Sequence, residues 1–229
     1  MTLETLIPLK ARTGIAALTF AAMVMPLPAA ADAFTFSTGS PDGRIGTLSR
    51  PNLGPGLIET ETADDFILSQ QTSLTQATFT GLIPAGATVT QVEIEFYHVF
   101  PTDSAFPPSG NVVSRTNSPA DNEIAAATRD SLAGSLSFST TTLSPNFSVS
   151  NTVVNGIHKI PNQFTGGEGP TSGQEIQISV NFLPPVDLPA DQYFFRPEAA
   201  LSSGNFYGCR QPGRRSSRAI FKAGYEMRT

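Results

Sequence analysis

Two segments of the chain alternate apolar and polar side chains with a period of two residues, and this pattern constrains the fold more than any other. In residues 89–100, the even positions from Val92 onward are mostly apolar, whereas the odd positions include Glu93 and Glu95. Residues 176–182 repeat the pattern with isoleucine, valine and phenylalanine at the even positions. Successive side chains of a strand point to opposite faces, so both segments are expected to be strands with one buried face.

The rest of the sequence favours the same class of structure. Charged residues make up 14% of the chain, against about 25% in an ordinary soluble protein. Threonine, serine, asparagine, glycine and proline take their place and suit strands joined by many turns. Residues 125–133 are the one plausible short helix. We therefore predict an all-β domain, an antiparallel β-sandwich or jelly roll of about eight to ten strands.

The first 33 residues have the pattern of a secretory signal peptide. Lys10 and Arg12 precede an uncharged, mostly apolar run over residues 13–25, and Ala31–Ala33 forms a small-x-small cleavage site. The apolar run is shorter than the ~20 residues that a membrane-spanning helix needs. We predict cleavage before Phe34, secretion to the extracellular or periplasmic space, and no stable membrane span in the mature protein.

Charge divides the remaining chain into two parts. Residues 34–207 carry six basic and sixteen acidic side chains, whereas residues 208–229 carry six basic and one acidic. The acidic part is expected to be the β-sandwich domain and to repel nucleic acid. The basic part lacks a strand pattern, which predicts either a disordered basic tail or a reading frame shifted near Tyr207.

Acidic clusters provide weak candidates for a metal site. With Cys209 as its single cysteine, the chain has no intramolecular disulfide, and a bound ion would help stability. Calcium prefers several carboxylate and carbonyl oxygens. The sequence predicts a structural Ca²⁺ as a cofactor, and six side chains are its candidate ligands: Glu59, Glu61, Asp64, Asp65, Asp121 and Glu123.

Histidines and paired carboxylates are the other candidate catalytic groups. His98 shares the apolar side of its predicted strand, which indicates a packed core histidine rather than a ligand or a base. Glu93 and Glu95 lie two residues apart on the opposite side. Their spacing is compatible with the separation of about 5–5.5 Å in retaining glycosidases, although charged side chains also alternate on any half-solvated sheet.

Four short segments resemble exported bacterial β-sandwich proteins of the PEP-CTERM type. They are Thr62–Leu68 (Thr-Ala-Asp-Asp-Phe-Ile-Leu), the strand segments 77–81 and 92–97, and the turn and strand Leu188–Phe195. The chain is also similar to uncharacterised exported proteins of soil bacteria. The Pro-Glu-Pro sorting signal of the first group is not found in this sequence, and the resemblance implies no catalytic residue.

These patterns lead to two hypotheses about function. The first is a non-catalytic exported protein that binds a cell surface, extracellular matrix or glycan through a loop or a sheet face. The proline-rich segment 101–121 is the candidate loop, with Phe106 and Tyr97 as binding residues. The alternative is a secreted hydrolase that acts on polysaccharide and uses Glu93 and Glu95 as its carboxylate pair. A cleft with convergent carboxylates favours the enzyme, whereas a flat or filled face favours binding.

Overall fold

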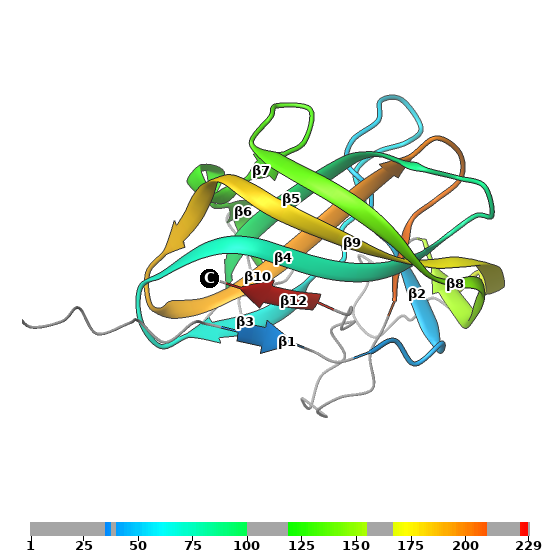
Figure 1. Cartoon of the computed structure of the whole chain (residues 1–229), viewed down its shortest axis with the longest axis horizontal. Helices are drawn as coiled ribbons and strands as arrows, with labels where there is room; N and C mark the ends of the chain where they lie inside the picture. Colours follow the sequence, from blue (N-terminus) through cyan, green and yellow to red (C-terminus); the bar gives the residue numbers. More distant parts are fainter. Residues whose placement is uncertain (1–34, 38–39, 100–118, 155–166, 210–224, 229) are drawn as a thin grey trace, which may run out of the picture. The chain divides into compact units, whose positions relative to one another are not determined.

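The computed structural model describes residues 35–37, 40–99, 119–154, 167–209 and 225–228. The predicted signal peptide and Phe106 lie outside these residues, as does most of segment 101–121. The described residues form two sheets, which confirms the all-β prediction (Figure 1).

The larger sheet contains seven strands, and five of them close into a ring. In spatial order the strands are β1 (Thr35–Ser37), β12 (Tyr225–Arg228), β4 (Thr72–Ile83), β11 (Tyr207–Cys209), β2 (Ile45–Leu48), β8 (Leu136–Val153) and β9 (Gly169–Leu188). Because β9 also pairs with β4, the ring runs through β4, β11, β2, β8 and β9. The pairing of β2 with β8 is parallel, so the larger sheet is not a plain antiparallel layer.

The smaller sheet has β10 and β5 at its centre. Its strands are β3 (Asp64–Leu68), β10 (Asp191–Leu201), β5 (Val89–Val99), β6 (Pro119–Glu123) and β7 (Arg129–Asp130). Both β6 and β7 pair with β5. The sequence predicts a short helix over residues 125–133. The described residues of this range form one 3₁₀ turn, Ala125–Ala127, which is followed by β7.

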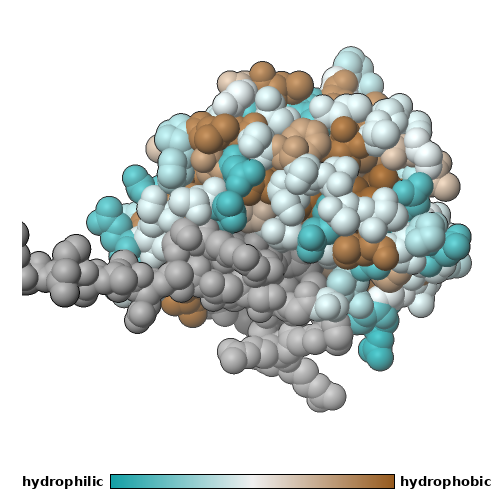
Figure 2. Space-filling model, viewed as in Figure 1, coloured by the Kyte–Doolittle hydropathy of each residue, from teal (hydrophilic) through white to brown (hydrophobic). Residues whose placement is uncertain are grey.

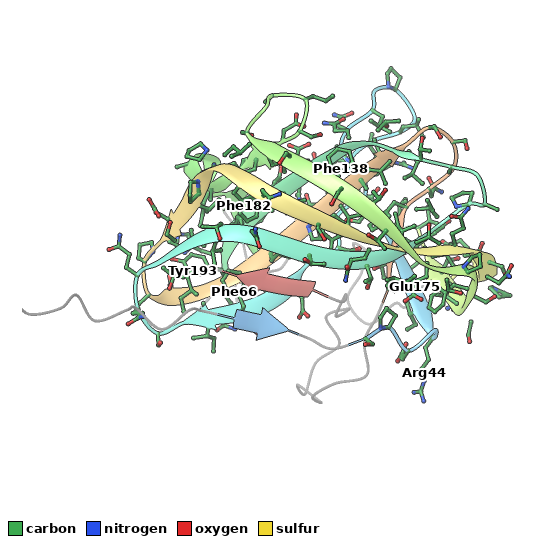
Figure 3. All side chains as sticks on the ribbon, viewed as in Figure 1. Arg44, Phe66, Phe138, Glu175, Phe182 and Tyr193 are labelled. Carbon is green, nitrogen blue, oxygen red and sulfur yellow. The ribbon has the colours of Figure 1, made fainter. Side chains whose placement is uncertain are left out.

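The main hydrophobic core draws residues from both sheets. Phe79 and Ile178 enter it from the larger sheet, and Phe96 and Phe195 enter it from the smaller one, each at most 1% exposed. Figure 3 labels four further aromatic side chains of this core: Phe138 and Phe182 from the larger sheet, Phe66 and Tyr193 from the smaller. The apolar faces predicted from the two-residue period in 89–100 and 176–182 are therefore largely buried.

Two features of the larger sheet are not visible in the local sequence pattern. The segment 167–173 is rich in glycine, as loops often are, yet β9 begins at Gly169. The close approach of two strands requires glycine there, because a Cβ atom on Gly173 would lie 2.1 Å from the carbonyl oxygen of Ile83. From Leu136 to Val153 the chain forms one long strand, β8, with register shifts between 142 and 152, and not several short strands.

The predicted basic segment 208–229 contributes backbone to the larger sheet. Within it the structure describes residues 208–209, which belong to β11, and residues 225–228, which form β12. Strand β12 pairs with β4 on one side and with β1 on the other. The frame-shift hypothesis and the position of the domain boundary stay predictions.

Candidate functional site

Strand β10 carries an arginine and a glutamate within an otherwise largely apolar run. The core face of β10 holds Tyr193 and Phe195, so alternation places Arg196 and Glu198 on the opposite, outer face of the smaller sheet. On the neighbouring strand β5, Glu95 lies directly across from Arg196, and Glu93 lies across from Glu198. The outer face of this sheet is therefore ionic, yet Arg196 is 1% exposed and Glu198 is fully buried.

Four glutamates surround Arg196. Its guanidinium forms ion pairs with Glu59, Glu61 and Glu95, and its Nη2 lies 3.5 Å from Oε1 of Glu198. We call these five side chains, together with Tyr97, the Arg196 cluster. Four carboxyl groups facing one guanidinium leave an excess of negative charge that the cluster must compensate by other means.

Tyr97 completes the cluster from β5. Its hydroxyl accepts a hydrogen bond from Nη1 of Arg196 at 2.8 Å and donates one to Oε2 of Glu95 at 3.0 Å. The Arg196 guanidinium carbon also lies 5.2 Å from the centre of the tyrosine ring, within cation–π range. Burial is the largest cause of the raised pKa of Tyr97, so the tyrosine stays protonated and keeps its donor.

Glu198 compensates part of the excess charge by keeping its proton. Burial raises the pKa of Glu198 to about 9; Arg196 opposes this shift, and the neighbouring glutamates reinforce it. Neither of its carboxyl oxygens has a hydrogen-bond partner among the described residues. A carboxyl group in such a place is more stable neutral than charged. At neutral pH, Glu198 is therefore a carboxylic acid.

Glu59 and Glu61 reach Arg196 from a loop over the outer face of the smaller sheet. We call residues 49–62 the strap. Its ends are fixed: Oγ of Ser49 donates to the Pro197 carbonyl at 2.7 Å, and the Thr62 hydroxyl donates to the Leu48 carbonyl at 3.0 Å. Between these ends, the two glutamates connect the strap to the sheet through Arg196.

The six predicted calcium ligands therefore lie in different environments. Glu59 and Glu61 face a guanidinium. Asp64 is buried, and Asp65 accepts a hydrogen bond from Gln192. Asp121 and Glu123 belong to β6, where their side chains are not described. Among the described residues, no group of three or more histidine, cysteine, aspartate or glutamate side chains is arranged to hold a metal ion. A structural calcium stays a prediction.

The other candidate residues have the following positions. Glu95 belongs to the Arg196 cluster and is 8% exposed, whereas its proposed partner Glu93 is partly exposed and lies opposite Asp130 in register. Tyr97 is buried in the same cluster. The prediction of a core histidine was wrong: His98 lies at the end of β5, its side chain is 54% exposed, and its Nδ1 is 3.2 Å from Oδ2 of Asp191.

Sequence reasoning missed the central residue of this cluster, although a signal for it exists. In Tyr-Phe-Phe-Arg-Pro-Glu, the residues of both alternating sets are large or apolar, which is typical of a strand buried on both faces. Within such a strand, Arg196 and Glu198 are two residues apart on one side. A buried arginine requires acidic partners, so this pattern points to the glutamates of the neighbouring strand.

A second surface, on the larger sheet, is polar, and its described side chains are uncharged. On the outward face of β4, β9 and β8, nine hydroxyl and amide side chains form three rows across the strands: Gln76–Asn181–Ser137, Thr78–Ser179–Ser139 and Thr80–Gln177–Thr141. All except Thr80 are at least partly exposed. We call this surface the hydroxyl–amide face; pale and teal side chains cover most of the surface over these strands in Figure 2.

The hydroxyl–amide face contains a hollow. It has a volume of about 370 Å³ and lies over the β4–β9 pair, lined by Gln76, Ala77, Thr78, Gln177, Ser179, Val180 and Asn181. At its rim, Nε2 of Gln76 donates a hydrogen bond to Oδ1 of Asn181 at 2.9 Å. The nearest acid along β9, Glu175, lies beyond the rows, and burial raises its pKa. Among the described residues, the lining of the hollow is thus rich in donors and acceptors and carries no charge.

Comparisons with protein-family models, curated proteins and solved structures give no match for this chain. In the part of the chain that the structure describes, there is no helix with the length and apolar character to cross a membrane. The Arg196 cluster and the hydroxyl–amide face are therefore interpreted from their own geometry and chemistry.

Proposed function

We propose that this protein is exported and acts without catalysis, binding a neutral glycan through the hydroxyl–amide face. The observation that carries the proposal is the register of β4, β9 and β8, which aligns nine uncharged polar side chains in three rows. Neighbouring strands are about 4.8 Å apart, and side chains on one face recur about every 6.8 Å along a strand. Such an array can contact several hydroxyl groups of one polymer at once.

The chemistry of the side chains suits a carbohydrate. Hydroxyl and amide groups both donate and accept hydrogen bonds, as sugar hydroxyls do. An uncharged face does not have to desolvate an ion when a neutral ligand covers it. The hollow between Gln76 and Gln177 gives the array a concave centre, and concave surfaces bury more of a small ligand than flat ones do.

The arrangement of the carboxylates favours binding over hydrolysis. Glycoside hydrolysis needs two carboxyl groups that both reach the substrate. In this protein Glu95 contacts Arg196 and Tyr97 instead and is almost completely buried. The second member of the proposed pair, Glu93, is not a member of the Arg196 cluster.

Binding of the full chain to insoluble and soluble neutral polysaccharides tests the proposal. The double variant Ser139→Glu/Thr141→Glu places two charges on exposed positions of the face and should lower retention at least tenfold. The matched control, Gln70→Glu/Gln71→Glu, places two charges on an exposed turn away from the face and should leave binding unchanged. Equal binding by the wild type and the Ser139/Thr141 variant would show that the face is not the binding site.

A further inference from the structure

We infer that the hollow of the hydroxyl–amide face takes an acetamido sugar unit, so that the ligand is a neutral glycan containing N-acetylated amino sugars. The inference rests on the proposed function and adds the class of sugar. It is drawn from the three amide side chains that line the hollow, Gln76, Gln177 and Asn181.

These amides provide a pattern of donors and acceptors that hydroxyl groups alone do not. A primary amide has two N–H donors and one carbonyl acceptor, held in a plane. The bond from Gln76 to Asn181 uses one N–H of Gln76 and the carbonyl of Asn181. The Gln76 carbonyl and the Asn181 amino group lie outside this bond, one an acceptor and the other a donor. Gln177 adds a third amide; it lies on β9, the strand of Asn181, two residues before Ser179.

An acetamido group matches this pattern. It is a planar amide with one N–H and one C=O, so it can donate to a side-chain carbonyl and accept from a side-chain amino group simultaneously. A sugar hydroxyl in the same place has no planar pair of donor and acceptor. Since one hydrogen bond contributes roughly 1 kcal/mol net, an additional bond corresponds to about a fivefold gain in affinity.

The described side chains of the hollow lining carry no charge, which favours this ligand over the common charged derivatives of amino sugars and hexoses. A free amino sugar is a cation and a uronic acid is an anion, and each would leave a desolvated charge without a partner against uncharged residues. The volume of about 370 Å³ lies near the lower end of ligand pockets, which span about 300–1,000 Å³. The hollow therefore suits a short unit of the polymer rather than a long segment.

Titration calorimetry with two matched ligands tests the inference. The probes are β-1,4-linked oligomers of N-acetylglucosamine and of glucose with the same number of sugars, each added to the full chain. We expect the acetamido series to bind at least fivefold more tightly. Equal affinity for both series, or tighter binding of the glucose series, would overturn the inference while the proposed function stands. Binding of neither neutral polysaccharides nor oligomers would overturn both.

A near-isosteric variant tests whether the hollow causes the preference for the acetamido series. Asn181→Asp keeps the shape of the side chain but replaces the amino donors by a carboxylate oxygen, and it should abolish the preference for the acetamido series. Ser137→Ala, in the same cross-strand row but outside the hollow lining, should retain it. Circular dichroism checks that both variants fold, and the comparison of the two ligand series on the wild type needs no variant. A preference that persists in folded Asn181→Asp would contradict the role of the hollow.

Discussion

The hydroxyl of Tyr97 lies 2.8 Å from Nη1 of Arg196, on the neighbouring strand of the same sheet. The pair connects β5 and β10 on the face of the smaller sheet away from the main hydrophobic core. A guanidinium removed from water is stable only if charged and hydrogen-bonded partners surround it. The glutamates and Tyr97 meet this requirement, and the outer face of the sheet is consequently held together by charge where a second apolar core would be expected.

Removal of Arg196 should destabilise the protein strongly. Arg196→Met leaves the buried carboxylate of Glu95 without its cation, and breaking a buried ion pair in this way typically costs about 3–5 kcal/mol. Urea unfolding followed by circular dichroism measures the change. Arg44→Ala, at an arginine whose side chain is 76% exposed, is the control and should change the free energy of unfolding by less than about 0.5 kcal/mol. A similar small change for Arg196→Met would contradict the proposed role of the cluster.

The stability of the protein should decrease as the pH rises from 4.5 to 9. The pKa of Glu198 is raised from its usual value near 4.5 to about 9 by burial, so in this window the folded state keeps a proton that the unfolded state has lost. The slope contributed by one such group is at most about 1.4 kcal/mol per pH unit.

Replacement of Glu198 by glutamine should flatten this pH dependence. Glu198→Gln cannot ionise and should stabilise the protein at pH 8 relative to the wild type, with little difference at pH 4. Urea midpoints measured across the pH range provide the test, with Glu168→Gln, at an exposed glutamate, as the control. Parallel pH profiles for Glu198→Gln and the wild type would rule out a buried acid that holds its proton.

Loss of the two strap glutamates should loosen the strap while the sheets stay folded. Glu59→Gln/Glu61→Gln removes the charges that attract the C-terminal part of the strap to Arg196, but the hydrogen bonds of Ser49 and Thr62 at its ends persist. Hydrogen exchange in residues 52–58 should become faster, whereas exchange in β5 and β10 should change little. Unchanged exchange in 52–58 would show that other contacts hold the strap.

The thiol of Cys209 should be unreactive in the folded protein. Cys209 is fully buried, and burial raises its pKa to about 12, so little of the nucleophilic thiolate forms at neutral pH. Alkylation by iodoacetamide should be slow in buffer and rapid in 8 M urea. Since Cys209 is the single cysteine of the chain, mass spectrometry reads the extent of reaction directly. Rapid labelling of the folded chain would mean that β11 opens readily.

The buried strand faces could be predicted from the sequence, but their ends could not. The two-residue period identifies Ile94 and Phe96 as core residues, and both are fully buried. His98 continues the same period but lies where β5 ends, and its side chain is 54% exposed. Periodicity predicts to which face of the sheet a side chain points. How far along the strand that face is buried depends on the pairing of the strands, which the local pattern does not show.

The candidate sites depend on pairings between residues distant in sequence. Glu59 and Arg196 are 137 residues apart, and no local pattern predicts that the first lies against the second. The rows of the hydroxyl–amide face likewise require the register of β4 with β9 and of β9 with β8. The alternation in 176–182 does predict that Gln177, Ser179 and Asn181 share one outward face, but not which side chains flank them.

The closed ring of the larger sheet also determines when the chain can fold. Gly46 of β2 pairs with Cys209 of β11, so the ring is incomplete until nearly the whole chain is present. Contacts between such distant residues form slowly, because the intervening chain must first lose much of its conformational freedom. Most of the chain must therefore be synthesised before the native topology can form. Truncation ahead of β11 would remove the strand that lies between β2 and β4 and leave the ring open.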